Sequence, residues 1–286
     1  MTHFYKIAGI TVKVSAEDSI MYTDSEMLSP YLTDECENAV SFEFSLCDEM
    51  PKPHGEQIAH TGNVRVFSTP FGEQRYYGDV NFSFSSAGMC VTYEKDVITV
   101  KVKKNKFCQG INPHHILDSI MLEHLITMRG GVLLHSSFIK YKDSAILFTA
   151  PSGVGKSTQA RLWCELEGAE LINGDKSAVY TDEVCGIPFS GSSGVQLNKS
   201  APPRAIVYLA QARENSIKRL YGKEAFIHVW EGCVVNLWNH NDVVRAIDNV
   251  NNVITQIPIY RMACTKDGTS VEFLKKNIFD IKTNEA

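Results

Sequence analysis

The amino-acid sequence predicts a mixed fold, α+β with an α/β portion, in which a β-rich amino-terminal part precedes a part that combines strands and helices. Over residues 1–110, apolar side chains often alternate with polar ones, which is typical of strands with one buried face. A glycine-rich segment at 149–158 stands between an apolar, strand-like run and a segment with helical character. We therefore expect a recognition or scaffold region at 1–110 and a second domain at 111–286.

The composition is that of a globular protein, and we expect a cytoplasmic location. Of 286 residues, 44% are hydrophobic and 21% are charged, and no apolar run reaches the roughly 18–20 residues that cross a bilayer. The net charge of −5 argues against non-specific nucleic-acid binding. The start of the chain lacks the pattern of a signal peptide, and the eight cysteines form no C-x-x-C pair, which indicates reduced thiols. We thus expect neither nucleic acid nor membrane as a partner.

Several segments of the first domain predict strands. In the run 40–46, Val40, Phe42, Phe44 and Leu46 fall on one face. Further strands are expected at 4–14, 64–67, 81–84, 91–93 and 97–102, with a turn at Lys95-Asp96. This region carries no recognisable catalytic motif. Acceptor recognition, scaffolding, dimerisation and a purely structural role all stay open for it.

A helix and a β-hairpin are expected before the glycine-rich segment. Asn112 is a favourable N-cap, Pro113 suits the first helical position, and an apolar stripe runs from there to Met128. A strand at 132–140, a turn at 141–144 and a strand at 145–148 would then form a hairpin. Nucleotide-binding loops are more often built into a parallel βαβ unit, so this order is informative.

The glycine-rich segment has the pattern of a phosphate-binding loop, G-x-x-x-x-G-K-[ST], with Ala150 in place of the first glycine. Gly153 and Gly155 let the backbone turn its N–H groups inward around an anion, and the start of the following helix adds positive charge. Lys156 can reach terminal phosphates, and the Ser157 hydroxyl can bind Mg²⁺. The candidate nucleotide-binding residues are Ser152, Gly153, Val154, Gly155, Lys156, Ser157 and Thr158.

An acid follows the next predicted strand. The run 169–176 reads as a buried strand that contains Asp175 near its end, downstream of the loop and its helix, which is a suitable place for a Mg²⁺ ligand. A strand-end Asp that only caps a turn is the alternative. The small, hydroxyl-rich stretch 190–194 either shapes the site or is a plain surface loop.

The remaining elements are read from periodicity and capping signals. We expect helices at 157–167, 223–238 and 269–278, a helix capped by Asp242 with its stripe at 243–254, strands at 177–181, 184–189, 205–209, 217–220 and 258–262, and a frayed tail at 282–286.

Several segments, taken in order, resemble one known family. They read LHSS at 134–137, APSGVGKS at 150–157 and LINGDK at 171–176, with the hairpin between the first two. In this order they resemble the kinase domain of HPr kinase/phosphorylase, which is similar in fold to the ATP-dependent phosphoenolpyruvate carboxykinases. The stretches PRAIVYL at 203–209 and PIYRM at 258–262 resemble those of stand-alone HPr-kinase-related proteins. The resemblance covers about 130–279 and implies a P-loop kinase domain of this type.

The resemblance implies ATP and Mg²⁺ as cofactors. Lys156 and the loop amides would hold the phosphates, Ser157 and Asp175 would hold the metal, and His135 would lie near the transferred phosphate, unless it is only a structural histidine. Arg204, and after it Arg261, is the candidate that stabilises the transferring phosphoryl group. The expected catalytic residues are therefore Asp175, His135, Lys156 and Arg204.

The chain departs from the family at the acid. The HPr-specific enzymes usually carry two adjacent Asp residues where this sequence has Gly174-Asp175, and they have another residue in place of Pro151. These differences, and the missing phosphorylase signature, favour a kinase for a hydroxyl on a peptide, protein or small molecule. A nucleotide-binding regulatory protein with little catalysis and a phosphorylase running the reverse reaction are the alternatives. Because relatives are often oligomeric, a homo-oligomer is a further expectation.

Overall fold

The chain divides into two compact units, Met1–Leu122 and Glu123–Ala286, each of which is described by itself. The structure is a computed structural model, and it describes residues 1–20, 26–70, 72–79, 81–94, 97–104, 111 and 113–279. Along the chain, the boundary between the units falls at the start of helix α2 (Leu122–Met128), so helix α1 (Pro113–Ser119) belongs to the first unit. The sequence-based boundary after residue 110 would instead assign α1 to the second.

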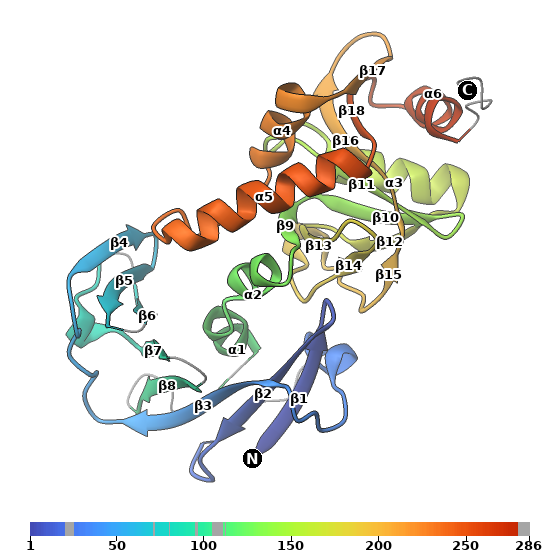
Figure 1. The fold of residues 1–286 in the computed structure, drawn as a ribbon. Helices are drawn as coiled ribbons and strands as arrows, with labels where there is room; N and C mark the ends of the chain where they lie inside the picture. The colour runs from blue at the N-terminus through green and yellow to red at the C-terminus, as the bar shows by residue number, and fades with distance from the viewer. Residues whose placement is uncertain are drawn as a thin grey trace. The chain divides into compact units, whose positions relative to one another are not determined.

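An eight-stranded mixed sheet forms the first unit (Figure 1). Its strand order is β1-β2-β3-β8-β7-β6-β5-β4, in which β3 is parallel to both neighbours and the other pairs are antiparallel. The strands are β1 (Thr2–Ile7), β2 (Ile10–Ala16), β3 (Val40–Cys47), β4 (Gln57–Thr61), β5 (Val64–Thr69), β6 (Gly72–Tyr77), β7 (Met89–Glu94) and β8 (Val97–Lys103). The predicted alternation in β3 is confirmed for Phe42 and Phe44, which are both buried.

Two expectations for this unit are wrong, and two of its strands were not expected. Residues 4–14 form two strands, because Ala8 and Gly9 both have positive φ (50° and 74°) and turn the chain into the β1–β2 hairpin. Residues 81–84 form no strand, and a short 3₁₀ helix occupies Phe84–Ser86. Strands β4 and β6 were missed, the latter because buried polar residues interrupt its apolar pattern. The predicted turn at Lys95-Asp96, the N-cap Asn112 and the tail lie outside the described residues.

The second unit contains a six-stranded sheet of order β12-β10-β11-β16-β18-β17 and a four-stranded sheet of order β15-β14-β13-β9. In the larger sheet β11, β16 and β18 are mutually parallel, whereas β10 is antiparallel to β11 and β12. The strands are β9 (Val132–His135), β10 (Ser137–Tyr141), β11 (Ser144–Thr149), β12 (Glu170–Asn173), β13 (Lys176–Val179), β14 (Val184–Gly186), β15 (Ser200–Ala201), β16 (Pro203–Gln211), β17 (Ser216–Leu220) and β18 (Ile259–Cys264). The helices are α3 (Lys156–Glu167), α4 (Gly222–Trp230), α5 (His240–Gln256) and α6 (Thr269–Ile278), besides α2.

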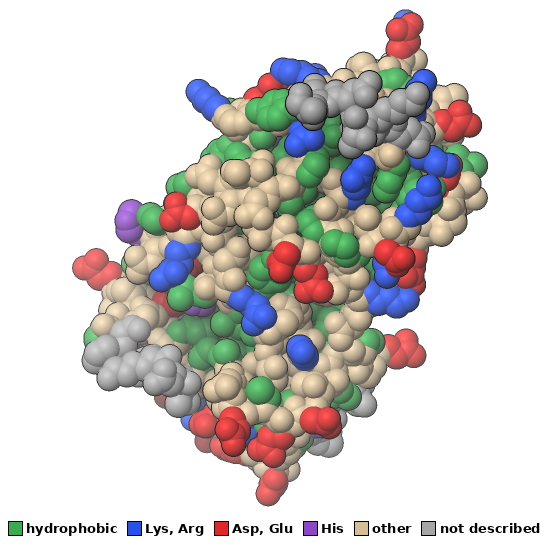
Figure 2. Space-filling view, turned by 45° about the vertical axis from the view of Figure 1, so that its right-hand side comes forward, with side chains coloured by type: hydrophobic (Ala, Val, Ile, Leu, Met, Phe, Trp, Pro, Cys, Tyr) green, Lys and Arg blue, Asp and Glu red, His purple; other side chains and the backbone are tan. Residues whose placement is uncertain are grey.

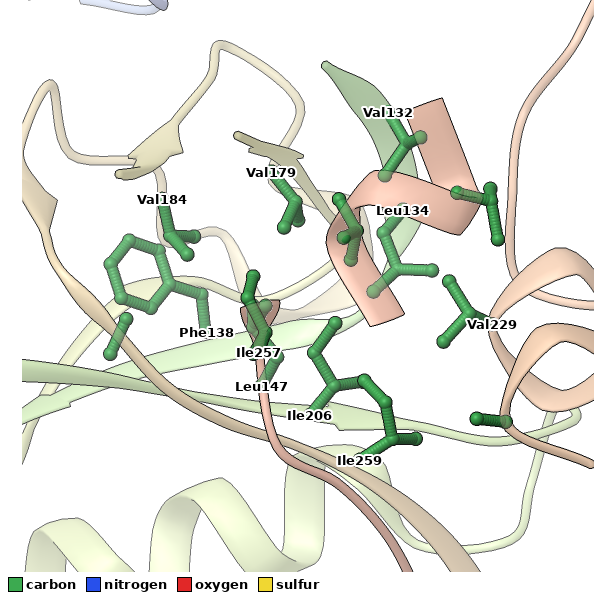
Figure 3. Close-up of a cluster of buried hydrophobic side chains, with 14 of the residues drawn as sticks. Val132, Leu134, Phe138, Leu147, Val179, Val184, Ile206, Val229, Ile257 and Ile259 are labelled. Atoms are coloured by element: carbon green, nitrogen blue, oxygen red, sulfur yellow. The ribbon is translucent and has the colours of Figure 1, made fainter. Parts of the chain in front are cut away.

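Two apolar cores cover the two faces of the six-stranded sheet. On one face, Phe148 of β11 packs in a cluster with Trp163 of α3 and Leu274 of α6. On the other face, Leu147 belongs to a cluster that includes Val229 of α4 and residues of α5 and the four-stranded sheet (Figure 3). Both faces of β11 are therefore buried, which explains why its sequence is continuously apolar rather than alternating.

The hairpin before the glycine-rich segment is confirmed. Strands β10 and β11 pair antiparallel, and the turn residues Lys142 and Asp143 have φ of 48° and 58°. Residues 132–140, however, form two strands instead of one: the chain leaves the smaller sheet at His135 and enters the larger one at Ser137. The predicted helices at 157–167 and 269–278 agree with α3 and α6 to within one residue.

Three further helix predictions need correction. The helix expected from Pro113 to Met128 is two helices, because Met121 has φ of 45° and interrupts the helical path. The helix expected at 223–238 ends at Trp230. Asp242 is not the cap of the next helix: the Asn239 side chain accepts hydrogen bonds from the N–H groups of Asn241 and Asp242, so Asn239 is the N-cap.

The surface carries charges of both signs. On the face drawn in Figure 2, Lys and Arg side chains lie among Asp and Glu side chains, in keeping with a net charge of only −5. Within the described ranges, none of the helices has the length and apolar character needed to cross a membrane.

Candidate functional site

The glycine-rich loop, residues 149–158, joins the end of β11 to the start of α3. Strand β11 ends at Thr149 and α3 begins at Lys156. Gly153 has φ of 78° and Gly155 has φ of 131°, a conformation that side chains on Cβ disfavour strongly. The two glycines bring the backbone N–H groups of the loop to the amino-terminal end of a 12-residue helix. Such an end attracts anions because its first N–H groups have no partners within the helix.

Lys156 closes the loop. Its Nζ donates a hydrogen bond to the Ala150 carbonyl at 2.9 Å. The first residue of α3 is thereby bonded to the residue that follows β11. Burial lowers the pKa of Lys156, while the Asp175 carboxylate acts in the opposite direction and raises it. The ammonium of Lys156 and the carboxylate of Asp175 are therefore near enough to influence each other electrostatically.

Asp175 lies in a turn between two strands rather than at the end of the predicted strand 169–176. Strand β12 ends at Asn173, and β13 begins at Lys176. The fully buried Asn173 side chain holds this turn: its Oδ1 accepts from the N–H groups of Asp175 (2.9 Å) and Lys176 (3.0 Å), and its Nδ2 donates to the Ile187 carbonyl (2.6 Å). Sequence reasoning did not single out Asn173, although Asn-Gly is a recognisable turn signal.

His135 lies beside Asp175. Its Nδ1 is 3.3 Å from Asp175 Oδ1. The same Nδ1 is buried and has no aligned hydrogen-bond partner among the residues that the structure describes. The Thr149 hydroxyl donates to the His135 carbonyl at 3.1 Å, which links β9 to the first residue of the glycine-rich loop. The loop, His135 and Asp175 are thus brought together from three separate segments.

The stretch 190–194 packs directly against the acid. Its residues Gly191–Ser193 form a 3₁₀ turn. A Cβ atom on Gly191 would lie 2.7 Å from Asp175 Cβ, and a Cβ atom on Gly174 would collide with the Ser193 side chain. The stretch therefore packs on the turn that carries Asp175, and it leaves no room for a side chain at position 174.

Arg204 lies away from the loop, contrary to its predicted role. It stands at the start of β16, where Pro203 pairs with Ala145, whereas the glycine-rich loop follows the opposite ends of these parallel strands. Its guanidinium donates from Nε to the Ile278 carbonyl at 2.9 Å and lies over the Phe279 ring. The second candidate, Arg261, pairs in register with Tyr208 and borders a cavity beside the loop.

The residues present fit a magnesium nucleotide. The donors at the loop are backbone N–H groups and the Lys156 ammonium, which suit phosphate oxygens, and the hydroxyl and carboxylate oxygens of Ser157 and Asp175 are of the type that suits Mg²⁺. The buried Nδ1 of His135 lies 3.3 Å from the Asp175 carboxylate and adds a polar atom beside it. Among the described residues, no group of three or more His, Cys, Asp or Glu side chains forms an all-protein metal site. That is compatible with Mg²⁺, which commonly binds through few carboxylates together with substrate phosphates.

No protein-family model and no curated protein sequence matches the chain. Among solved structures there is a similarity to the HPr(Ser) kinase/phosphatase from Coxiella burnetii, with 10% sequence identity and a TM-score of 0.30. It covers 51% of this chain and 94% of that one. Such a similarity is a distant structural relationship and does not establish a shared activity.

Proposed function

We propose that the chain is an ATP- and Mg²⁺-dependent kinase that transfers the γ-phosphate to a hydroxyl of a peptide, protein or small molecule. The observation that supports this most directly is the convergence of three segments: the glycine-rich loop before α3, His135 at the end of β9, and Asp175 in the turn between β12 and β13. A partly buried cation, Lys156, at an anion-binding loop and an acid in the neighbouring turn suit the positioning and charge neutralisation that phosphoryl transfer requires.

Each residue has a distinct task in this proposal. Lys156 and the loop N–H groups would hold the phosphates, and Ser157 and Asp175 would hold Mg²⁺, which would supply charge neutralisation on the transferring group. The acceptor oxygen bonds to the γ-phosphorus while the bond to the β–γ bridging oxygen breaks, so that ADP leaves. The acceptor proton passes to the Asp175 carboxylate, and His135 Nδ1, 3.3 Å from Asp175 Oδ1 before the transfer, helps to position that carboxylate.

The test is Mg²⁺-dependent turnover of labelled ATP by the full chain and its Lys156→Ala variant. We expect the variant to lose at least about 100-fold in turnover, in line with the removal of one preorganised charge donor. Lys140→Ala is the matched control, because Lys140 is also partly buried but pairs with Asp143 at the far end of the hairpin. Unchanged turnover in a folded Lys156→Ala protein would contradict the proposal.

A nucleotide-binding regulatory protein with little catalysis is the second candidate. It is favoured by the packing of Ser193 against Gly174, which leaves Asp175 alone to serve both the metal and the acceptor hydroxyl. Tight binding of ATP, without turnover and without a labelled product in a screen of peptides, proteins and small hydroxyl compounds, would favour this candidate.

A further inference from the structure

A cavity of about 590 Å³ opens beside the glycine-rich loop, on the side of β16 and β18. Pro151–Val154 form one wall, and Tyr208, His228 and Arg261 line the others. Neither Lys156 nor Asp175 is among its lining residues. The proposed function places the transferred phosphate, and hence the acceptor, beside Lys156 and Asp175. Because neither residue lines this cavity, the cavity suits the other end of a bound nucleotide.

Two aromatic rings give the cavity a flat surface. The rings of Tyr208 and His228 are stacked, with centroids 4.1 Å apart and an interplanar angle of 29°. Apolar groups of Val154 and Leu209 border the same space. The cavity is open to solvent and combines apolar groups with a few polar ones, and its flat ring surface suits a nucleobase, which stacks on aromatic side chains.

The rings and the loop are held in place by further contacts. His228 Nδ1 lies 3.5 Å from Glu231 Oε2, and the Tyr208 hydroxyl also interacts with this carboxylate. Gln211 Nε2 donates to the carbonyls of Gly153 (3.3 Å) and Val154 (3.0 Å), so the end of β16 is fastened to the loop. The stacking surface therefore keeps a fixed position relative to the phosphate-binding backbone.

We propose that this cavity binds the nucleobase of the bound nucleotide, which stacks on the Tyr208–His228 pair. The inference rests on the proposed function, because it takes the phosphates to be held by the glycine-rich loop. Recognition by stacking depends on the ring surface more than on the identity of the base. The pair consequently contributes to the affinity for nucleoside triphosphates and contributes nothing to the affinity for the triphosphate group alone.

The experiment compares the affinities for ATP and for inorganic tripolyphosphate, each with Mg²⁺, by titration calorimetry on the full chain. We expect the wild type to bind ATP at least about tenfold more tightly, since stacking on an aromatic side chain contributes a factor of this order. His228→Ala should reduce this preference and leave the affinity for tripolyphosphate unchanged. Tyr208→Phe should keep the preference, because it keeps the ring. Tyr221→Ala is the control, since Tyr221 is exposed and lies outside the cavity lining.

The outcomes separate the two proposals. If tripolyphosphate binds as tightly as ATP, or if His228→Ala weakens both ligands equally or neither, the nucleobase site is wrong while the phosphate-binding role of the loop stands. If the wild type binds neither ligand, both proposals are wrong. Melting curves followed by circular dichroism show whether each variant is folded, and Tyr208→Leu tests the ring independently if His228→Ala does not fold.

Discussion

Asn173 Oδ1 accepts a hydrogen bond from the backbone N–H of Asp175 at 2.9 Å, so a fully buried amide sets the position of the acid two residues further along. Asn173 touches neither the loop nor Lys156 in the interactions described above. Its effect on the site is therefore indirect, through the shape of the turn that presents the carboxylate.

Asn173→Ala is expected to lower both stability and ATP turnover. The change leaves the N–H groups of Asp175 and Lys176 and the Ile187 carbonyl without their partner, which costs about 3 kcal/mol in the free energy of unfolding. Asn249→Ala is the control: Asn249 is also buried, and it donates to the carbonyls of Thr127 and Gly131. Denaturant unfolding and turnover per folded molecule should show similar destabilisation of both variants but reduced turnover only in Asn173→Ala. Equal turnover in the two variants would contradict the positioning role.

Gly174→Ala is expected to destabilise the protein through the Ser193 side chain, and Ser193→Gly should rescue it. An added Cβ collides with Ser193, whose hydroxyl donates to the Ser190 carbonyl at 2.6 Å. Ser193→Gly alone loses this bond and should cost about 1 kcal/mol. In a double-mutant cycle measured by urea unfolding, we expect the double variant to be more stable than additivity predicts, with a coupling of about 1–3 kcal/mol. Strict additivity would show that the two residues do not meet.

Replacement of Gly155 or Gly168 by Asn should distinguish the cost of backbone strain from the cost of a packing clash. A Cβ atom at Gly155 or Gly168 would have no other atom within 4 Å, so neither substitution causes a clash. Gly168 ends α3 in the left-handed region (φ 66°, ψ 25°), which Asn tolerates, whereas φ of 131° at Gly155 suits glycine alone. We expect Gly168→Asn to cost less than about 1 kcal/mol, and Gly155→Asn to cost about 1–3 kcal/mol and to weaken ATP binding. Equal ATP affinity in the two variants would exclude a role for the unusual Gly155 backbone.

The first unit should lose stability as the pH falls below neutrality. Burial, with a smaller effect from His114, lowers the pKa of His115 from 6.5 to about 4. Between these values the unfolded chain binds a proton that the folded one does not, so stability is lost as the pH falls from about 6.5 toward 4. The loss is on the order of 1 kcal/mol, because partial exposure screens the effect. An NMR titration of the imidazole should show no protonation at pH 5, and His115→Gln should flatten the pH dependence of unfolding. A midpoint near 6.5 would contradict the prediction.

Local signals predict much of the second unit and the loop. The order of hairpin, glycine-rich loop and helix is visible because turn residues, glycines and helical periodicity each act within a few positions. The break at Ser136 is not visible, because the polar residues His135, Ser136 and Ser137 between the two apolar runs include no glycine or proline that signals a change of strand, and β9 and β10 are both largely buried. Met121 likewise gives no signal that it interrupts a helix.

A single sequence points to candidate residues where a short local pattern marks them. Lys156 and Ser157 follow from the loop pattern, and Asp175 from its place after a strand. The predicted place of Arg204 near the loop is wrong, because Arg204 stands at the start of β16, at the opposite end of the sheet from the loop. The direction of β16 relative to β11 decides this, and a single sequence does not show it. Asn173 acts through buried hydrogen bonds that only the folded turn reveals.

His135 ends a strand of the four-stranded sheet, while the glycine-rich loop follows a strand of the six-stranded sheet, and Asp175 lies where the chain passes from one sheet to the other. The polar site thus lies between two separately hydrogen-bonded sheets. The apolar side chains packed between these sheets set the distances among His135, Asp175 and the loop. A small loss of volume there, such as a shortened Leu134 or Ile172, would shift His135 and Asp175 relative to the loop without altering any polar group. The packing between the two sheets therefore sets the geometry of the polar site as well as the stability of this unit.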